Sequence, residues 1–538
     1  MGVRVCLFFF LFVSFGASPH CRLCGEDLAS RLQKEAVQSR VADWAHWGPN
    51  SASYSSWTSH TSRLIPIYSF GADLNPVRGV NSPYRSEERI KDLFGHVPEE
   101  TLNPDAEYFD QTGVHLLQEL AAKSGKRCIV LFVFDGMDWQ TTQAASVYKL
   151  KRVAYGEGRG TGLHFQDYRG APTDYGYFVT SPHNEGTKVD INAQRLTNPG
   201  GDVRGGYSPR LGGDTPWAKP KDTGYLIGKG EVLKHAYPDS AATATAMTSG
   251  VKTYNDSINV DPVGRHTVPI ARVLQEQGYA IGVVTSVPIS HATPACAYAN
   301  NVHRDDYQDL TRDLMGLPSV SHPTPLAGVD VLIGAGWHED KTKDGPQGSN
   351  FVAGNRYLME ADRQAADQSN GGKYLIVERN SGQNGERLLR TAADQAIINR
   401  HRLFGFFGVK GGHLPFATAD GRYNPVLSVG QGAESYSPAD IDENPTLAQM
   451  AVSALDVLHS RSEKMWLMVE AGDVDWANHA NNLDNSIGAV ISGDEAFAAV
   501  TSWIEKNVGW DNAALFLTAD HGHYLVLDRP EALAAEKH

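Results

Sequence analysis

Short apolar segments that alternate with helical segments constrain the fold of this chain most strongly. Residues 128–136 (CIVLFVFDG) have the length and character of a buried strand, and similar strands are expected at 64–70, 280–285, 329–333, 374–377, 403–407, 465–470 and 514–520. Apolar side chains recur with the 3.6-residue helical period over residues 446–460, and further helices are expected at 114–123, 268–277 and 493–506. This alternation predicts an α/β fold in which a mostly parallel central sheet is flanked by helices on both faces.

The sequence also suggests how the chain is divided. Residues 1–18 combine an arginine, an apolar run and small residues, as in a secretory signal peptide cleaved near residues 16–18. Residues 19–127 are polar and loop-rich, and we expect them to form an extension packed on a main domain of residues 128–538. Within that domain, residues 154–230 are rich in Gly, Pro and Asp with interleaved aromatic residues, which predicts a long loop insertion.

Charge and cysteine usage narrow the class of protein. The formal net charge of −14 argues against nucleic acid or an anionic membrane surface as a partner. The signal peptide predicts a periplasmic or secreted protein. No later segment is long and apolar enough for a membrane span, so we expect the mature protein to be soluble. Cys21 and Cys24 form an isolated CxxC pair, which favours a disulfide or a disordered tail over a zinc site, whereas Cys128 and Cys296 have the surroundings of small core residues.

Three of the expected strands end in a carboxylate, namely Asp135, Glu470 and Asp520. Each carboxylate alone is more typical of a turn or a helix cap. In an open α/β sheet, however, ligands bind at the carboxyl ends of the strands, where the three side chains would converge. Like charges that converge need cations between them, so this pattern indicates a metal site.

Histidines accompany two of these carboxylates. Asp475 and His479 are spaced i and i+4, which lets both side chains reach one cation from the same helix face, although a solvated helix pair has the same spacing. His521 and His523 directly follow Asp520 in the sequence TADHGH, and an apolar strand that opens into such groups cannot bury them cheaply without a partner. Together the two motifs favour metal binding.

The stretch YPDSAATATA around Ser240 allows two interpretations. It can be an ordinary buried helix start with Asp239 or Ser240 as the N-cap. It can also present a nucleophilic serine at a helix N-terminus, where backbone N–H groups attract an anion. Two metal ions near one serine would suit phosphoryl transfer.

Five segments resemble, in order, the active-site segments of alkaline phosphatases: VFDGMDWQTT, YPDSAATATAMTSGVKT, SHATPACAYANNVHR, VEAGDVDWANHA and TADHGH. The resemblance covers about residues 128–310 and 445–525. It implies an alkaline-phosphatase-like catalytic domain that releases phosphate from small-molecule phosphate monoesters through a phosphoserine at Ser240. It further implies two Zn²⁺ and one Mg²⁺ as cofactors, and it leaves open a homodimeric assembly.

The resemblance also implies roles for individual residues. Ser240 would be the nucleophile, and Arg304 would grip two phosphate oxygens. Asp475 and His479 would bind the zinc ion that activates water, whereas Asp520 and His521 would bind the zinc ion that holds the Ser240 oxygen. Asp135 would bridge that zinc ion and the magnesium ion, which Thr293 and Glu470 would also serve.

The chain departs from the family pattern at three positions. His291 stands where many relatives have aspartate, which predicts weak magnesium binding or replacement by zinc or cobalt. Trp476 stands where some bacterial relatives have lysine. The third histidine of the water-activating zinc site is not found well downstream, so His523 substitutes for it, the ligand comes from elsewhere, or the sequence is truncated; we favour His523.

The sequence is also compatible with other functions. A phosphodiesterase of the same superfamily would use the same metal ligands, while the Ala/Thr tract after Ser240 argues against a sulfatase. A secreted phosphate-binding or metal-binding protein without turnover is the alternative outside enzymes. The intact Ser240, Asp135 and Arg304 weigh against it.

Overall fold

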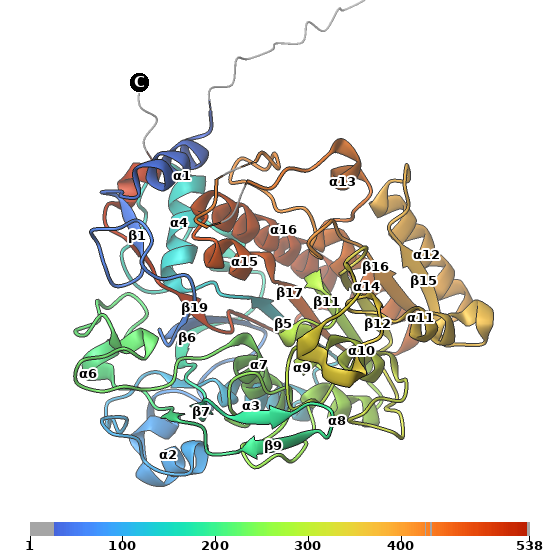
Figure 1. Ribbon diagram of the computed structural model, residues 1–538, viewed down its shortest axis with the longest axis horizontal. Coiled ribbons are helices and arrows are strands. Elements are labelled where there is room, and N and C mark those ends of the chain that lie inside the picture. Colours follow the sequence, from blue (N-terminus) through green and yellow to red (C-terminus); the bar gives the residue numbers. More distant parts are fainter. Residues whose placement is uncertain (1–25, 426, 431–432, 535–538) are drawn as a thin grey trace, which may run out of the picture.

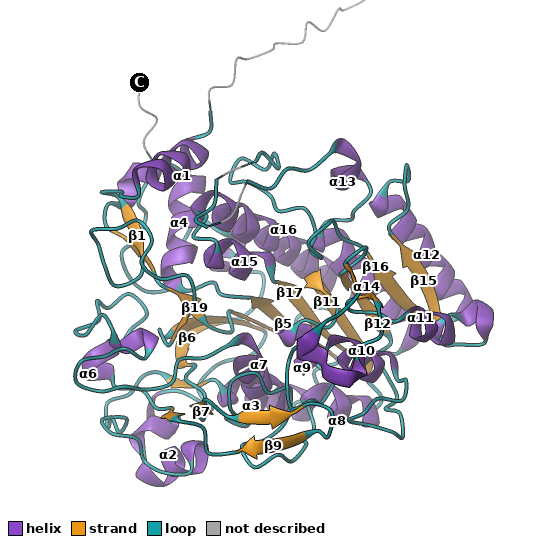
Figure 2. Ribbon diagram, viewed as in Figure 1, coloured by secondary structure: helices purple, strands orange, loops and turns teal. Residues whose placement is uncertain are grey.

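A ten-stranded sheet forms the centre of the molecule (Figures 1 and 2). The structure is a computed structural model that describes residues 26–425, 427–430 and 433–534, so the expected signal peptide and the Cys21/Cys24 pair lie outside the described residues. The strand order across the sheet is β15 (Tyr374–Glu378), β16 (Arg402–Phe406), β12 (Val331–Ala335), β11 (Ala280–Pro288), β17 (Met465–Ala471), β5 (Cys128–Phe134), β18 (Ala513–Thr518), β3 (Ile65–Phe70), β6 (Thr173–Val179) and β4 (Phe109–Asp110). Across the sheet, each strand from β15 through β16, β12, β11, β17 and β5 to β18 pairs parallel with the next. Strand β3 pairs antiparallel with both of its neighbours, β18 and β6.

The register of the central strands brings their carboxyl ends to one level. In the adjacent strands β17 and β5, Glu470 is opposite Val133 and Ala471 is opposite Phe134. In β18, Thr518 is opposite the same Val133. Asp135, Glu470 and Asp520 therefore leave three neighbouring strands at the same edge, which confirms the convergence expected from the sequence.

Helices cover both faces of the sheet, as the alternating pattern predicted (Figure 2). On one face α12 (Gly385–Asn399), α14 (Leu447–Arg461) and α16 (Leu483–Asn507) pack side by side, with α4 (Trp139–Leu150) and α1 (Leu28–Ser39) against α16. On the other face α3 (Thr112–Lys123), α7 (Ser240–Ser249) and α8 (Ile270–Glu276) pack together, and α9 (Ala292–Cys296) lies against α7. The strands between these layers are almost fully buried, which explains their continuous apolar sequences.

The N-terminal segment, residues 26–127, contributes directly to the central sheet. Its strand β3 pairs with β18, and its two-residue strand β2 (His60–Thr61) pairs antiparallel with β19 (Gly522–His523) beyond the end of β18. Buried Arg63, next to β2, donates a hydrogen bond of 3.0 Å to Asp138 at the start of α4. The segment is thus joined to the main domain by strand pairing and by a buried ion pair.

Residues 154–230, expected to be a loop insertion, also contain regular structure. Strand β6 from this region occupies the sheet between β3 and β4. The remainder includes the short helices α5 (His164–Asp167) and α6 (Pro209–Gly212), a hairpin of β8 (Lys188–Asp190) with β9 (Arg195–Asn198), and the strands β7 (Asn184–Glu185) and β10 (Val203–Arg204). Strand β6 has an irregular burial pattern, so its sequence lacks the continuous apolar run that marks the other strands.

Helix α16 begins ten residues earlier than the sequence predicted, at Leu483. Its first half contains Asp484, Ser486 and Gly488, which have low helix propensity but are buried against neighbouring elements. Asn482 caps the helix by accepting a hydrogen bond from the backbone N–H of Asn485. Among the described residues, no helix has both the length and the apolar character needed to cross a bilayer.

Candidate active site

Ser240 is the first residue of α7, a helix buried over nearly its whole length. Asp239 is the N-cap, because its side chain accepts a hydrogen bond of 2.9 Å from the backbone N–H of Ala242. The small residues that follow let α7 pack closely on α3 and α9. Ser240 Oγ lies 3.1 Å from Nε2 of His521 and 3.5 Å from Oδ1 of Asp135, so a nucleophile-like hydroxyl and the helix N-terminus face the carboxyl edge of the sheet.

Three groups of candidate metal ligands lie beside this serine. The donor atoms within each group lie within 4.8 Å of one another; the groups are His60, Asp475, His479 and His523; Asp135, Asp475 and His521; and Asp135, His291 and Glu470. Asp135 and Asp475 each belong to two groups, so the three groups are contiguous. All the predicted metal-ligating histidines and carboxylates except Asp520 occur in these groups. Asp520 also belongs to this neighbourhood, since one of its oxygens is 3.5 Å from His521 Nε2.

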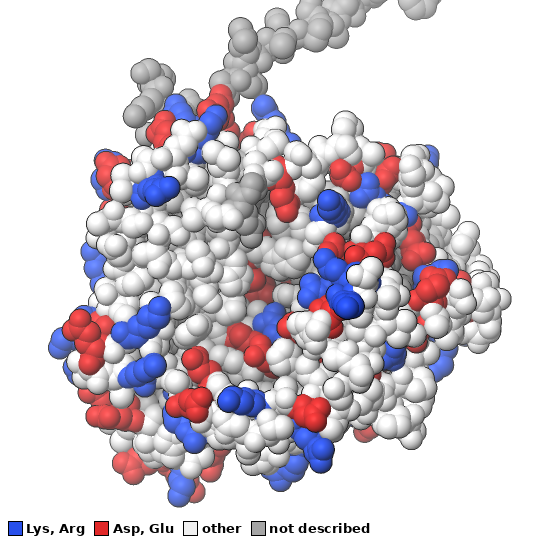
Figure 3. Space-filling model, in the orientation of Figure 1, with Lys and Arg blue, Asp and Glu red and all other residues white. Residues whose placement is uncertain are grey.

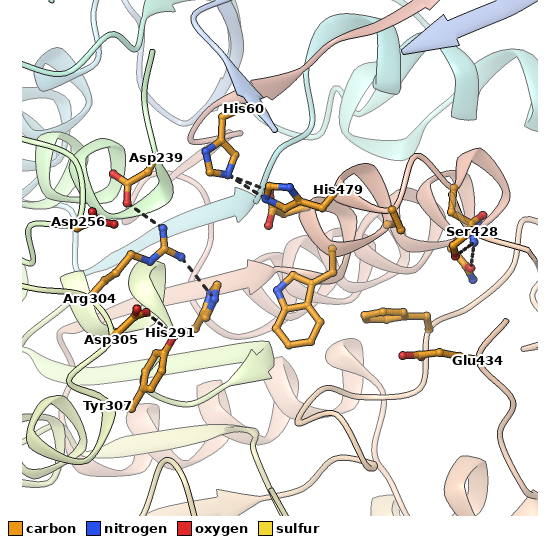
Figure 4. Close-up of a pocket in the computed structure, with 17 residues that line it drawn as sticks. His60, Asp239, Asp256, His291, Arg304, Asp305, Tyr307, Ser428, Glu434 and His479 are labelled. Carbon is orange, nitrogen blue, oxygen red and sulfur yellow. Dashed lines mark hydrogen bonds and ion pairs between the residues drawn. The ribbon is translucent and has the colours of Figure 1, made fainter. Parts of the chain in front are cut away.

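The first group contains His60, a residue that the sequence interpretation missed. His60 and His523 face each other as paired residues of β2 and β19, and His60 Nε2 is 3.0 Å from His479 Nε2 (Figure 4). His479 donates its Nδ1 hydrogen to the carbonyl oxygen of Thr58 at 2.6 Å, because a carbonyl can only accept. The Nε2 lone pair of His479 is consequently directed at the other members of the group, as in a metal-binding imidazole whose second nitrogen is fixed by a backbone carbonyl.

His523 makes a different contact within this group. Its Nε2 is 2.7 Å from Asp475 Oδ1, whereas the Nε2 atoms of His479 and His60 are 3.5 and 3.8 Å from the same oxygen. His523 therefore contacts Asp475 as a hydrogen-bond partner. A signal for His60 was present in the sequence, since it stands just before the expected strand at 64–70, but a lone histidine there carried no metal-binding pattern.

The third group combines an imidazole with oxygen donors. His291 is the N-cap of α9, and Thr293 lies in its first turn. Helix α9 contacts β17, and a ring nitrogen of His291 lies within 4.8 Å of carboxylate oxygens of Asp135 and Glu470. Glu470 accepts a short hydrogen bond from Thr285 on the neighbouring strand β11. The buried Nδ1 of His291 has no hydrogen-bond partner among the described residues.

The pKa shifts of the buried carboxylates and histidines are those expected of a metal-binding site without its ions. Burial, reinforced by the charges of Asp475 and Glu470, raises the pKa of Asp135 well above its ordinary value. Burial likewise raises the pKa values of Glu470 and Asp520 to about 8. Burial lowers the pKa of His60 well below its ordinary value and that of His523 to about 4, so these imidazoles are neutral and can act as ligands at neutral pH. The residues present thus fit bound metal ions.

Arg304 is held at the mouth of the site by Asp239. Its Nη1 donates a hydrogen bond of 2.9 Å to Asp239 Oδ2, and its Nη2 is 3.4 Å from Nε2 of His291 (Figure 4). The resemblance to alkaline phosphatases implied that Arg304 binds phosphate, but it did not identify the residue that orients Arg304. The guanidinium group lines a cavity of about 500 Å³ that also exposes His60, His291 and Asp475.

The alkaline phosphatase family profile matches residues 228–532, which is more than half of the chain. The chain belongs to the alkaline phosphatase family. The matched region contains Ser240 and most of the other candidate site residues. These are Asp239, His291, Thr293, Arg304, Glu470, Asp475, His479, Asp520, His521 and His523. Asp135 and His60 lie outside it.

Two relatives known by sequence agree with this assignment. The chain is 27% identical to alkaline phosphatase 4 of Bacillus subtilis (strain 168) over 330 residues, which cover 59% of this chain and 58% of that protein. It is also 27% identical to alkaline phosphatase of Escherichia coli (strain K12) over 331 residues, which cover 58% of this chain and 64% of that protein. The crystal structure of Thermus thermophilus alkaline phosphatase overlaps 74% of this chain and 60% of that chain with a TM-score of 0.43 and 20% identity. The chain therefore spans about three fifths of the length of these relatives.

Proposed function

We propose that this protein is a secreted or periplasmic, metal-dependent phosphomonoesterase that transfers a phosphoryl group first to Ser240 and then to water. The observation that carries the proposal is the position of Ser240 Oγ. It lies at the N-terminus of α7, 3.1 Å from His521 Nε2, and next to contiguous groups of buried carboxylates and neutral imidazoles. Membership of the alkaline phosphatase family supports the activity. The apolar run in residues 5–15, as in a secretory signal peptide, supports the location.

We assign the ligands of two Zn²⁺ and one Mg²⁺ as follows. His60, Asp475 and His479 would hold the first zinc ion, while His523 orients Asp475 through its hydrogen bond. This assignment replaces the expectation that His523 is itself the third ligand. Asp135, Asp520 and His521 would hold the second zinc ion. Asp135, His291, Thr293 and Glu470 would hold the magnesium ion. When bound, these ions supply Lewis acidity and ease deprotonation of an attacking hydroxyl or water.

The residues of the chain supply binding and orientation. The backbone N–H groups at the start of α7 and the guanidinium of Arg304 both favour a phosphate beside Ser240. Asp239 fixes both elements, because one of its oxygens caps α7 and the other accepts a hydrogen bond from Arg304. Ser240 Oγ attacks the phosphorus atom and the alcohol leaves into the cavity; water then attacks the phosphoserine and releases inorganic phosphate.

The test is acid quenching during turnover of p-nitrophenyl phosphate, followed by mass spectrometry of the peptide that contains Ser240. We expect phosphate on Ser240 and faster hydrolysis of this monoester than of bis(p-nitrophenyl) phosphate. Faster diester hydrolysis would instead favour a phosphodiesterase of the same superfamily. Phosphate binding without turnover of either compound would contradict the proposal.

A further inference from the structure

The cavity extends past the metal-ligand groups to a part of the site that would receive the alcohol portion of a substrate. In Figure 4, Arg304 and Glu434 lie on opposite sides of the cavity, with His291 and His479 between them. Phe416 and Trp476 also line the cavity, and the rings of both contact His413, which in turn contacts Glu434. Trp476 directly follows the metal-ligand candidate Asp475, and its ring centre is 5.9 Å from that of His291. A phosphate held near Arg304 would therefore direct its ester group along Trp476.

Three rings form an aromatic corner in this region. His413 stacks on Phe416, with ring centres 3.9 Å apart and planes 14° apart. Trp476 meets both rings nearly at right angles, at 5.2 Å from His413 and 6.2 Å from Phe416. This packing fixes the orientation of the two aromatic rings that line the cavity.

Glu434 places a carboxylate at the edge of the aromatic corner. Its Oε1 is 3.3 Å from His413 Nε2, and its Oε2 accepts a short hydrogen bond from Tyr436. Burial raises the pKa of Glu434, but the hydrogen bonds from His413 and Tyr436 outweigh burial and hold the pKa below its ordinary value. The carboxylate is thus ionised at neutral pH and remains about half exposed.

The balance of charge around the cavity is negative. Arg304 is the one Lys or Arg side chain among the described residues that line it, and Asp239 already pairs with this guanidinium. Three further carboxylates line the cavity and belong to none of the metal-ligand groups: Asp256 and Asp305 lie on the Arg304 side, and Glu434 lies on the opposite side (Figure 4). Figure 3 shows acidic side chains in the hollow at the middle of this face. The alcohol portion of a bound ester, directed away from Arg304, would meet the aromatic rings and the half-exposed Glu434 carboxylate.

We propose that the site selects phosphate monoesters of cationic alcohols, such as amino alcohols or quaternary ammonium alcohols, an inference that rests on the proposed phosphomonoesterase function. A compact cation is attracted both by aromatic ring faces and by a nearby carboxylate. An anionic alcohol portion would be repelled by the Glu434 carboxylate. The cavity of about 500 Å³ accommodates a molecule of this size together with the phosphate.

The test compares choline phosphate with its neutral carbon isostere, in which a carbon atom replaces the quaternary nitrogen. The variant Glu434→Gln keeps the shape of the side chain and removes its charge. We expect it to lower kcat/KM for choline phosphate by about tenfold relative to its effect on the isostere. Because each substrate is compared with itself in the two proteins, the different reactivities of the two leaving groups cancel.

The matched control is Glu463→Gln, which removes a carboxylate that is 88% exposed just before β17, at the opposite edge of the sheet. It should leave the ratio between the two substrates unchanged. Equal effects of Glu434→Gln on both substrates would overturn the proposal, as would an equal change of the ratio in the control.

A second measurement uses the unmodified protein. Trimethylammoniopropyl phosphonate and its neutral carbon isostere are not hydrolysed, so their competitive inhibition constants report binding alone. We expect the cationic phosphonate to inhibit p-nitrophenyl phosphate hydrolysis about tenfold more strongly. Equal inhibition by both compounds would overturn the inference while leaving the phosphomonoesterase function intact, whereas the absence of any monoester hydrolysis would overturn both.

Discussion

Ser240 combines a hydroxyl, a helix N-terminus and an imidazole contact at a single position, so its removal should affect chemistry far more than folding. We expect Ser240→Ala to lower kcat for p-nitrophenyl phosphate by about a thousandfold or more, with unchanged metal content. Metal analysis and steady-state kinetics on the same preparation check both parts. The control Ser249→Ala alters the other end of the same helix, where the hydroxyl bonds Asn259, and should retain activity. Near-normal kcat in Ser240→Ala would exclude this serine as the nucleophile.

Substitutions of His60 and His523 test which of these histidines is the third ligand of the proposed first zinc site. If His60 is a ligand and His523 only orients Asp475, His60→Ala should weaken zinc binding more than His523→Ala, for which a loss of about 10- to 100-fold is expected. Competition with a chromophoric chelator measures both affinities. His401→Ala, a partly exposed histidine outside the site, serves as the control. The opposite order of the two variants would restore His523 as the ligand.

We expect His291 to determine the metal preference of the proposed magnesium site. Its imidazole brings nitrogen where an oxygen ligand would suit magnesium, so added Mg²⁺ should stimulate the native protein only weakly. We expect His291→Asp to strengthen that response. The measurement is activity against Mg²⁺ concentration for both proteins after chelation and zinc restoration. Strong, saturable activation of the native protein that the substitution does not increase would contradict the prediction.

At the scale of single elements, the sequence predicted most reliably the strands whose burial leaves a continuous apolar run. The continuous apolar runs of β5, β17 and β18 identified these strands, and their final carboxylates identified the metal-binding edge. The antiparallel position of β3 beside β18 depends on tertiary pairing and leaves no local pattern. His60 was missed for the same reason, because its approach to Asp475 follows from the pairing of β2 with β19.

Helix α7 shows how an element positions a residue through packing. Ala244 is fully buried in a cluster that includes Ala292 and Ala295 of α9, which leaves no room for a larger side chain. We expect Ala244→Leu to lower the free energy of unfolding by about 1–3 kcal/mol and to reduce activity, since α7 would move relative to the sheet. Denaturant unfolding and kinetics provide the measurements. The same substitution at exposed Ala365 in α11 (Glu360–Ala366) should be nearly neutral, and equal effects at the two positions would refute this account.

At the scale of the whole molecule, we expect metal binding to affect stability as well as function. Several carboxylates from different strands are buried together, and the strands come from both the N-terminal and the C-terminal halves of the main domain. In the metal-free protein these carboxylates repel one another and lack solvation. Bound cations would remove that penalty, so the ions should stabilise the fold as well as serve the reaction.

The pH dependence of the metal-free protein follows from the direction of these pKa shifts. Burial raises the pKa values of Glu470 and Asp520 to about 8 in the folded state, above their unfolded values. Their contribution to stability is therefore present below about pH 4 and is lost as the pH rises through about 8. We expect the chelated protein to lose about 2–5 kcal/mol of unfolding free energy between about pH 5 and about pH 8.5, and the metal-loaded protein to lose much less.

Thermal unfolding of both forms across this pH range checks the prediction, and Glu470→Gln provides a matched variant. The substitution keeps the shape of the side chain but removes one titrating group, so the chelated variant should lose less stability as the pH rises than the chelated native protein. In the presence of metal the variant should instead lose more stability than the native protein as the pH rises, because the variant lacks a charged ligand for the ion. A chelated native protein whose stability stayed constant over this range would show that the carboxylates are compensated without metal ions, and would contradict the role given to them here.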